Sequence, residues 1–246
     1  MGSIVLDTEK FYEILEIQNS LNKITIGENW VEDRFKNNTL IRFNLAYKME
    51  IMELVDSLPW KWWTKGEVDK DNLLVEAVDA LHFMLSIMYI YKANCNMEDF
   101  SKYEDLLTPQ FKSEYIVAMG DIINKDNIVM HLLSRCEDAL ATPKTDLGLV
   151  NSPRVLIPVV TPLYSILTAL HLYLGITMDD IYRAYITKAT LNKFRYTNGY
   201  LDGTYVKMWG SVEDNKVALE IMDKNKDFNS KDLYNALETA YKLHKK

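Results

Sequence analysis

Two pairs of acidic residues constrain this chain more than any other feature. Glu50 and Glu53 form the first pair, and Glu76 and Asp79 form the second. Both pairs lie in segments with a helical pattern, where a spacing of three places two carboxylates on one face of a helix. The first face comprises Phe43, Ala46, Glu50, Glu53 and Ser57, and the second comprises Asn72, Glu76, Asp79, Phe83, Ile87 and Ile90. Because the other members are mostly apolar or small, we expect the acids to point toward a partner element and not toward water.

The two predicted helices, residues 39–57 and 70–94, follow each other directly in the chain. Pro59 ends the first, and the connection is short enough to favour antiparallel packing of the two helices. Four carboxylates would then converge, and unpaired charges that are buried together are costly. A divalent cation removes that cost, and Mg²⁺ prefers oxygen ligands. The acidic pairs therefore predict a magnesium site, with solvated helix faces that carry ordinary acids as the alternative.

Length and composition predict a single all-α domain over residues 1–246. The chain has 48% hydrophobic and 26% charged residues, and its 9 glycines and 6 prolines are few for 246 residues. Residues 96–160 contain few sequence patterns that indicate a function. We expect them to form an insertion, either a mobile segment or a sub-domain.

Charge and cysteine content narrow the classes of partner and the location. A net charge of −7 without a long basic run argues against nucleic acid as a partner. The two cysteines, Cys95 and Cys136, predict no disulfide framework and favour a reducing environment. The N-terminus lacks a signal-peptide pattern, and no run of about 18 apolar residues predicts a membrane span. We therefore expect no membrane partner and an intracellular location, in the cytoplasm of a cell or encoded by a virus or phage.

Two amides are candidates for contact with a nucleobase. Gln18 and Asn22 lie four residues apart on a predicted helix that begins at Asp7 or Thr8 and ends near Lys23. Their side chains offer donors and acceptors together, which suits the edge of a pyrimidine. Ordinary surface amides with the same spacing are the alternative.

The turn between the acidic helices is rich in tryptophan. Trp60, Trp62 and Trp63 lie there with Lys61 and Lys65. So many large apolar side chains in one turn predict either a plug for the core or a wall on which a base stacks, with cations nearby. We expect one tryptophan in each role.

A basic and aromatic stretch between residues 188 and 209 is a candidate for phosphate binding. Lys188, Asn192 and Arg195 follow one another at spacings of four and three, so they share one face of a predicted helix. Arginine binds phosphate through two hydrogen bonds, and lysine acts as a point charge. The glycine-containing turn that follows adds Tyr200, Tyr205 and Lys207. The stretch predicts a polyphosphate site, with a solvated basic face as the alternative.

Weaker patterns predict the remaining elements. Helices are expected over residues 97–107, 111–124, 126–141, 162–174 and 178–192, with a linker over 142–158. Ser211 and Asp214 resemble a capping box for a helix that begins at Val212. A final amphipathic helix over residues 230–244 is expected to pack on the core or on a second subunit.

The order of these stretches resembles the dimeric, all-α dUTPases, part of the all-α NTP pyrophosphohydrolase superfamily. The blocks that carry the resemblance are Leu15–Asn22 with Thr25 and Trp30, Glu50–Trp63, Asn72–Phe83, Lys188–Trp209 and Glu213–Asn215. Where the family usually has asparagine, glutamine and lysine, this chain has Ala189, Tyr196 and Thr64. The resemblance implies a multi-helix bundle and an obligate homodimer.

The resemblance also implies roles for single residues in metal and phosphate binding. The implied Mg²⁺ ligands are Glu50, Glu53, Glu76 and Asp79. Among them, Glu53 would also act as the base or orient the attacking water. The implied phosphate binders are Lys188, Asn192, Arg195, Tyr200, Tyr205 and Lys207.

Further roles are implied for the nucleoside. The implied contacts with the base are Gln18 and Asn22 as readers of uracil, Trp62 or Trp63 against the ring, and Lys61 nearby. His82 and Phe83 would lie under the deoxyribose, where close packing excludes a ribose hydroxyl.

The reaction implied is hydrolysis of dUTP, and also of dUDP, to dUMP with two or more Mg²⁺ ions. Phosphoanhydride hydrolysis needs an in-line water and neutralised phosphate oxygens, which carboxylate-bound metals and basic side chains supply together. Three alternatives stay open. They are the same fold acting on another deoxynucleotide, a di-iron carboxylate bundle suggested by the acidic run that ends at His82, and a non-enzymatic protein that binds a structural cation.

Overall fold

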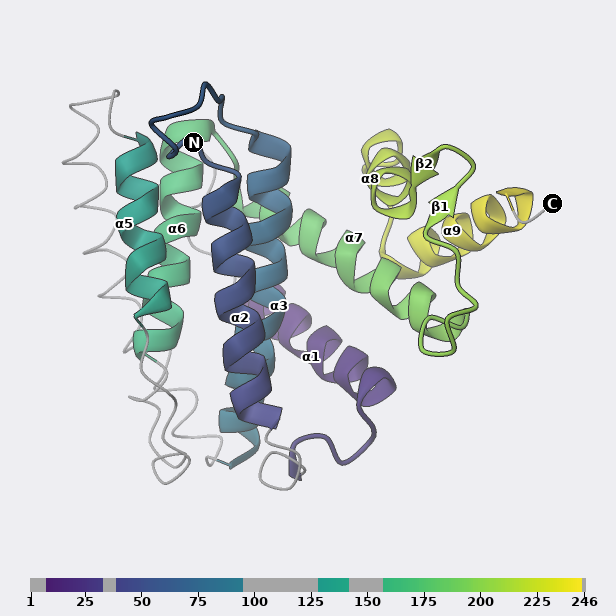
Figure 1. The fold of residues 1–246 in the computed structure, drawn as a ribbon. Helices are drawn as coiled ribbons and strands as arrows, with labels where there is room; N and C mark the ends of the chain where they lie inside the picture. Colours follow the sequence, from purple (N-terminus) through teal and green to yellow (C-terminus); the bar gives the residue numbers. More distant parts are fainter. Residues whose placement is uncertain (1–7, 33–38, 95–127, 142–156, 245–246) are drawn as a thin grey trace.

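The computed structural model describes residues 8–32, 39–94, 128–141 and 157–244 (Figure 1). These residues contain eight helices and one small hairpin. The helices are α1 (Thr8–Thr25), α2 (Thr39–Asp56), α3 (Lys70–Asn94), α5 (Ile128–Leu140), α6 (Ile157–Leu174), α7 (Met178–Thr197), α8 (Asp214–Lys224) and α9 (Ser230–His244). The hairpin pairs β1 (Met208–Trp209) with β2 (Val212–Glu213) in antiparallel orientation.

Helices α2, α3, α5 and α6 stand side by side and enclose the larger of two cores (Figure 1). Helix α2 packs along α3, α5 packs on α6 and on α2, and α6 packs on α3. Helix α3 lies deepest, and Leu81, Leu85 and Met88 on it are buried. From α5, Leu132 and Cys136 enter the same core. A helix surrounded in this way is apolar on most of its sides, which is why α3 shows only a weak amphipathic pattern.

Helix α7 connects the bundle to the C-terminal part of the chain (Figure 1). Gly175 ends α6 with a φ of 74°, and its N–H donates to the carbonyl of His171 (3.0 Å). Thr177 and Asp180 then form a reciprocal capping box that starts α7. The first half of α7 packs on α1 and α3.

A second, smaller core forms around the C-terminal half of α7. Its members are Leu191, Phe194, Tyr205, Trp209, Ala218, Met222, Leu233, Leu237 and Tyr241. The ring of Phe194 makes edge contacts with Tyr205, Trp209 and Tyr241. Since α7 contributes to both cores, the candidate phosphate-binding face on this helix lies where the two cores meet.

Most of the predicted helix boundaries are confirmed within the described residues. The predicted helices over 39–57, 70–94, 126–141 and 230–244 correspond to α2, α3, α5 and α9. The predicted helices over 97–107 and 111–124 lie outside the described residues, as does the predicted linker up to residue 156.

Two boundaries differ because tertiary packing extends the helices. Helix α6 begins at Ile157 and not at Pro162, so both Pro158 and Pro162 lie in its early turns. The first four N–H groups of a helix have no intrahelical acceptor, so Pro158 removes no hydrogen bond. Pro162 is the sixth residue of α6 and lies inside the helix, where it removes one intrahelical hydrogen bond. Helix α7 continues to Thr197 because its last turns pack into the second core.

The helix predicted to begin at Val212 is wrong. Val212 and Glu213 form β2, and α8 begins at Asp214 without a side-chain cap from Glu213. A left-handed turn at Gly210 (φ 68°) and the buried Trp209 close the hairpin before the helix starts. The carboxylate of Asp214 is bound to other side chains, as described below.

By length and hydropathy, one described helix segment, Lys70–Ala93, could span a membrane, and Pro158–Leu174 with Met178–Thr197 would pass the same test as one span with a 119° bend. Within the fold, 72% of the first segment's apolar window is buried. Its composition therefore fits the central helix of this core, as the packing above describes.

Candidate metal and nucleotide site

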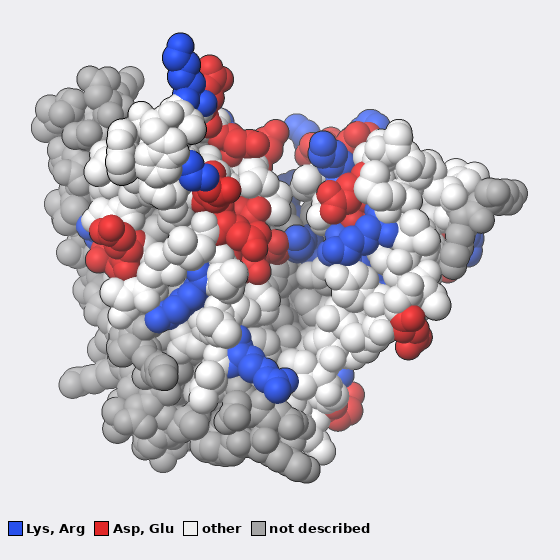
Figure 2. All heavy atoms as spheres, in the orientation of Figure 1, with Lys and Arg blue, Asp and Glu red and all other residues white. Residues whose placement is uncertain are grey.

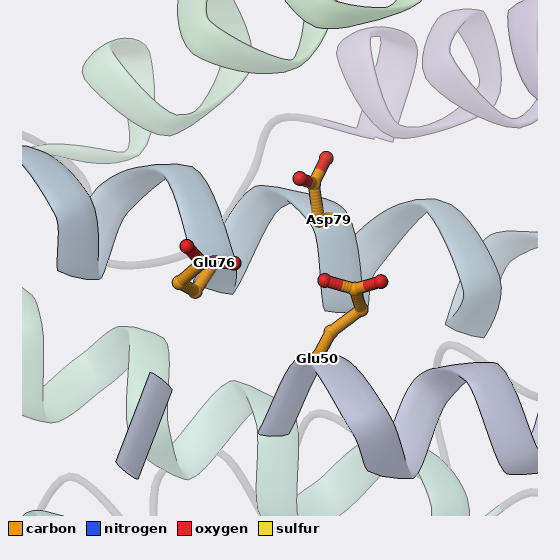
Figure 3. Close-up of side chains that lie close together, drawn as sticks. All are labelled: Glu50, Glu76 and Asp79. Atoms are coloured by element: carbon orange, nitrogen blue, oxygen red, sulfur yellow. The ribbon is translucent and has the colours of Figure 1, made fainter. Parts of the chain in front are cut away.

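Three carboxylates from two helices meet at one point. Glu50 extends from α2, and Glu76 and Asp79 extend from α3 (Figure 3). One oxygen of each lies within 4.8 Å of the others. Hard, anionic oxygen atoms gathered at this spacing fit a divalent cation such as Mg²⁺.

The predicted faces of α2 and α3 meet from Phe43 to Ser57, the residue after α2, and from Asn72 to Phe83 on α3. At one end the rings of Phe43 and Phe83 have centroids 6.3 Å apart, and at the other Asn72 Nδ2 donates to Ser57 Oγ (2.6 Å). Because low residue numbers on α2 oppose high numbers on α3, the helices are antiparallel, as predicted. The acids lie between these two contacts.

Burial and mutual repulsion make it unfavourable for the three carboxylates to be ionised at the same time. Burial, together with the charges of the neighbouring carboxylates, raises the pKa of Glu50 to about 7 and that of Glu76 to about 7. Burial also raises the pKa of Asp79, while the nearby ammonium of Lys188 lowers it. A cation bound here would favour the ionised forms, so the cluster is suited to metal binding.

Glu53 lies beside the three carboxylates and not among them. Its side chain is exposed. With Glu76 it lines an open, acidic pocket of about 360 Å³, whose other walls are Asp56, Ser57, Glu67, Asp69 and Asn72. Of the four predicted ligands, three are thus brought together, and Glu53 lies at the solvent side next to Glu76.

A basic surface faces the acidic one. Acidic side chains gather on the bundle and basic side chains on the part of the molecule opposite, with a hollow between them (Figure 2). Lys188 on α7 bridges the two, since its Nζ lies 2.7 Å from Oδ2 of Asp79. Asn192, one turn further along α7, is half-buried. The predicted phosphate-binding face of α7 therefore points toward the acids.

Arg195 is buried and firmly held. It is 7% exposed, and its guanidinium makes two hydrogen bonds with the carboxylate of Asp214 (2.8 and 2.7 Å). Tyr205, also buried, donates its hydroxyl to the same carboxylate (2.7 Å). Sequence reasoning placed Asp214 in a helix cap and missed this contact, because its position in the sequence gives no sign that Arg195 is its neighbour.

The turn after α7 presents the last two predicted phosphate binders. Tyr200 and Lys207 are exposed, and the Lys207 ammonium lies over the Tyr200 ring, 5.5 Å from its centroid. The turn depends on Gly199, whose φ is 92° and whose carbonyl accepts the N–H groups of Thr204 (3.0 Å) and Tyr205 (3.2 Å). A side chain with a Cβ is strained in this conformation.

The two amides predicted to read a base lie in the core and not on the surface. Gln18 is 4% exposed and Asn22 is 3% exposed. Gln18 Nε2 donates to Asn22 Oδ1 (2.9 Å), and Asn22 Nδ2 donates to Ser86 Oγ (2.9 Å). Tyr185, which sequence reasoning did not single out, donates its hydroxyl to Gln18 Oε1 (2.8 Å). The network fixes which edge each amide presents.

His82 is part of this network. Its Nδ1 lies 2.6 Å from Gln18 Oε1, and its ring stacks on Tyr185 with centroids 4.3 Å apart. Burial, followed by the charge of Lys188, lowers the pKa of His82 to about 3, so the ring is neutral. Since the amide oxygen needs a donor, Nδ1 carries the proton and Nε2 is an acceptor, one that has no partner among the described residues.

The metal-ligand cluster found among the described residues contains carboxylates alone. His82 is turned toward Gln18 and is not part of it. The geometry therefore gives no support to the di-iron alternative, in which His82 would be a ligand.

The tryptophans of the α2–α3 connection differ in burial, and one of them packs against the core as predicted. Trp60 is half-buried against the larger core, whereas Trp62 and Trp63 are 86% and 58% exposed. The rings of Trp62 and Trp63 meet edge to face, with centroids 4.4 Å apart. Lys61 is half-buried and pairs with Asp56 (2.5 Å). Two large rings are thus available to a ligand.

Comparison with known proteins gives a match at the level of the family. A family model described as dUTPase matches residues 10–200 of the chain. The chain belongs to the dimeric all-α dUTPase family. Among individually curated proteins, none matches it.

Family membership makes the protein an enzyme, a dUTP diphosphatase, as the resemblance implied. The match includes most of α1, the acidic helices of the dUTPase and the whole of α7, and it ends at residue 200. Tyr205, Lys207 and Asp214 lie beyond it. Most of the second core of this dUTPase therefore lies beyond the matched region, and α7 joins the two because its Leu191 and Phe194 belong to this core.

Proposed function

We propose that this dUTPase converts dUTP and dUDP to dUMP with Mg²⁺ held by Glu50, Glu76 and Asp79, and with Glu53 completing the ligand set. The observation that carries the proposal is the meeting of three carboxylates, all with raised pKa values, opposite a basic helix face. Clustered acids of this kind are costly unless a cation or a proton neutralises them.

Bound Mg²⁺ would neutralise charge on the phosphate oxygens and lower the pKa of the attacking water. Glu53, at the solvent side of the cluster, orients this water and accepts its proton. Lys188 and Arg195 neutralise the remaining charge on the chain of phosphates, while Lys207 and Tyr200 close over its end. The protein thus supplies position and charge, which is what phosphoanhydride hydrolysis requires.

The buried amide network supports recognition of uracil by Gln18 and Asn22. Because Tyr185 and His82 both donate to Gln18 Oε1, the Gln18 amide cannot rotate without breaking two hydrogen bonds. A fixed amide discriminates between bases that exchange a donor for an acceptor. Trp62 or Trp63 would cover the ring, and Phe83, half-buried beside His82, would contact the deoxyribose.

An exposed apolar stripe on α2 supports the homodimer. Ile41, Leu45, Met49 and Met52 recur at helical spacing and are 49%, 62%, 53% and 47% exposed. An apolar stripe that follows most of one helix is typical of a surface covered by a partner. We propose that a second copy of the chain covers it, which would place the interface on the helix that carries Glu50 and Glu53.

The test is product release from dUTP, dUDP, dCTP, dTTP and UTP, each with Mg²⁺ and with EDTA. We expect dUMP from dUTP and dUDP only when Mg²⁺ is present, and little product from the other nucleotides. Preference for another base would leave the metal site in place and overturn the uracil assignment. Hydrolysis that persists in EDTA would overturn the metal assignment.

A further inference from the structure

The carboxylate of Asp214 holds together much of the basic stretch. Asp214 is 0% exposed. Its Oδ2 accepts from Arg195 Nε (2.8 Å) and from the Tyr205 hydroxyl (2.7 Å), and its Oδ1 accepts from Arg195 Nη2 (2.7 Å). Its backbone N–H donates to the carbonyl of Lys207 (2.9 Å). One residue therefore contacts Arg195, Tyr205 and Lys207, all of which are candidate phosphate binders.

Burial makes this arrangement rigid. A buried carboxylate without its cation is strongly destabilising, so Arg195 cannot swing away from Asp214 at low cost. Asp214 is also the first residue of α8, where the helix dipole favours a negative charge. Asp214 thus fixes the position of the Arg195 guanidinium before any nucleotide binds.

One N–H group of Arg195 remains available to an anion. Its Nη1 donates to Asn192 Oδ1 and its Nη2 to Asn215 Oδ1, both at 3.2 Å. These contacts and those with Asp214 use four of the five N–H groups of a guanidinium, and the fifth, on Nη1, has no partner in the part of the chain that the structure describes.

We propose that Asp214 is a positioning residue for polyphosphate binding, which fixes Arg195 and the chain at Lys207 in the geometry that receives the phosphates, with the Tyr205 hydroxyl holding Asp214 itself in place. The proposal rests on the proposed function. It gives the second core, most of which lies beyond the family match, a role in the active site.

The first test compares Asp214→Asn with Asp223→Asn. Asp223 is exposed on the same helix, so its variant is a matched control. The Asp214 variant keeps the size of the side chain but removes the charge and turns an N–H₂ group toward donors. We expect about tenfold weaker binding of a non-hydrolysable dUTP analogue with Mg²⁺, and a raised KM for dUTP, because a charge-assisted contact is lost. Binding of dUMP should change less, and the control should match the wild type in both.

A double-mutant cycle separates positioning from general stability. If Asp214 acts mainly through Arg195, the loss caused by Asp214→Asn is much smaller in an Arg195→Met background. A role in folding alone would lower the melting temperature and the fraction of active protein, with KM unchanged, and that result would overturn the proposal. If Asp214→Asn does not fold, Arg195→Lys is used for the test, because lysine keeps the positive charge but lacks the planar guanidinium that binds Asp214 through two hydrogen bonds. Binding of the analogue as tight as in the wild type would then overturn the proposal.

Failure of the proposed function gives a different pattern. If the wild type hydrolyses dUTP while Asp214→Asn and Asp223→Asn bind the analogue equally, only the positioning role is wrong. If the wild type hydrolyses no nucleotide, the proposed function is wrong, and calorimetry with inorganic tripolyphosphate tests Asp214 by itself. Weaker binding by Asp214→Asn than by Asp223→Asn then supports the positioning role, whereas equal binding, or none in the wild type, overturns it.

Discussion

At the scale of single residues, the pKa values of Glu50 and Glu76 predict how metal binding depends on pH. Both are about 7, against 4.5 for an ordinary glutamate. The folded protein therefore keeps protons that the unfolded chain releases. Their contribution to stability is complete below pH 4.5 and is lost as the pH rises through about 7. Over the same window the carboxylates become available to a cation.

We expect Mn²⁺, used as a spectroscopic substitute for Mg²⁺, to bind about tenfold or more tightly at about pH 8 than at about pH 6. The rise in melting temperature caused by Mg²⁺ should also be larger at the higher pH. Glu50→Gln, which removes one of the two protons, should flatten the dependence. Equal affinity of the unmodified protein at the two pH values would contradict the prediction.

Lys188 gives a second prediction at this scale. Its ammonium lies 2.7 Å from Asp79, so it competes with a metal ion for that carboxylate. Lys188→Met is expected to bind Mn²⁺ about fivefold more tightly without nucleotide, since an exposed or half-buried charge pair is worth about 1 kcal/mol or more. The same variant should bind the non-hydrolysable dUTP analogue more weakly. Lys193→Met, an exposed lysine on the same helix, is the control, and equal Mn²⁺ affinities in the two variants would exclude the competition.

At the scale of elements, the helical spacing of side chains predicts the packing correctly where one face of a helix meets one partner helix. The faces that begin at Phe43 and Asn72 predicted the packing of α2 on α3, and three of the four acids meet there. The hairpin before Asp214 was not predictable, because strands of two residues have no period. The burial of Gln18 was also missed, since an amide shows no sign in sequence of the partners that allow it to enter a core.

The turn after α7 can be tested through its glycine. Gly199 has a φ of 92°, and a Cβ built there would lie 2.0 Å from Thr204 Oγ1. We expect Gly199→Ala to lower the free energy of unfolding by about 1–3 kcal/mol and to weaken polyphosphate binding, because the turn carries Tyr200 and leads to Tyr205. Gly66→Ala is the control, since a Cβ there meets Pro59 at an ordinary 3.4 Å. Equal chemical denaturation curves for the two variants would show that the turn tolerates a side chain.

At the scale of the whole molecule, the two cores and the apolar stripe of α2 have different roles. The larger core holds the acids and the amides, and the second core holds the residues that fix Arg195. Neither core uses Leu45, which is 62% exposed on the stripe of α2. If a second copy covers that stripe, the acidic helices of the two copies lie close to each other. Dimer formation and the activity of the metal site are then linked.

Leu45→Glu tests this link. A charge in the centre of an apolar interface is costly to bury, so we expect a monomer where the unmodified protein is a dimer, as measured by light scattering on a sizing column. The monomer itself should keep its helical circular dichroism, because the side chain is exposed within one chain. Leu243→Glu, a 68% exposed leucine on α9, makes the same chemical change elsewhere and should leave the dimer intact. If Leu45→Glu has the mass of the unmodified protein, the interface is not on α2. If it is a monomer with full activity, each active site is complete within one chain.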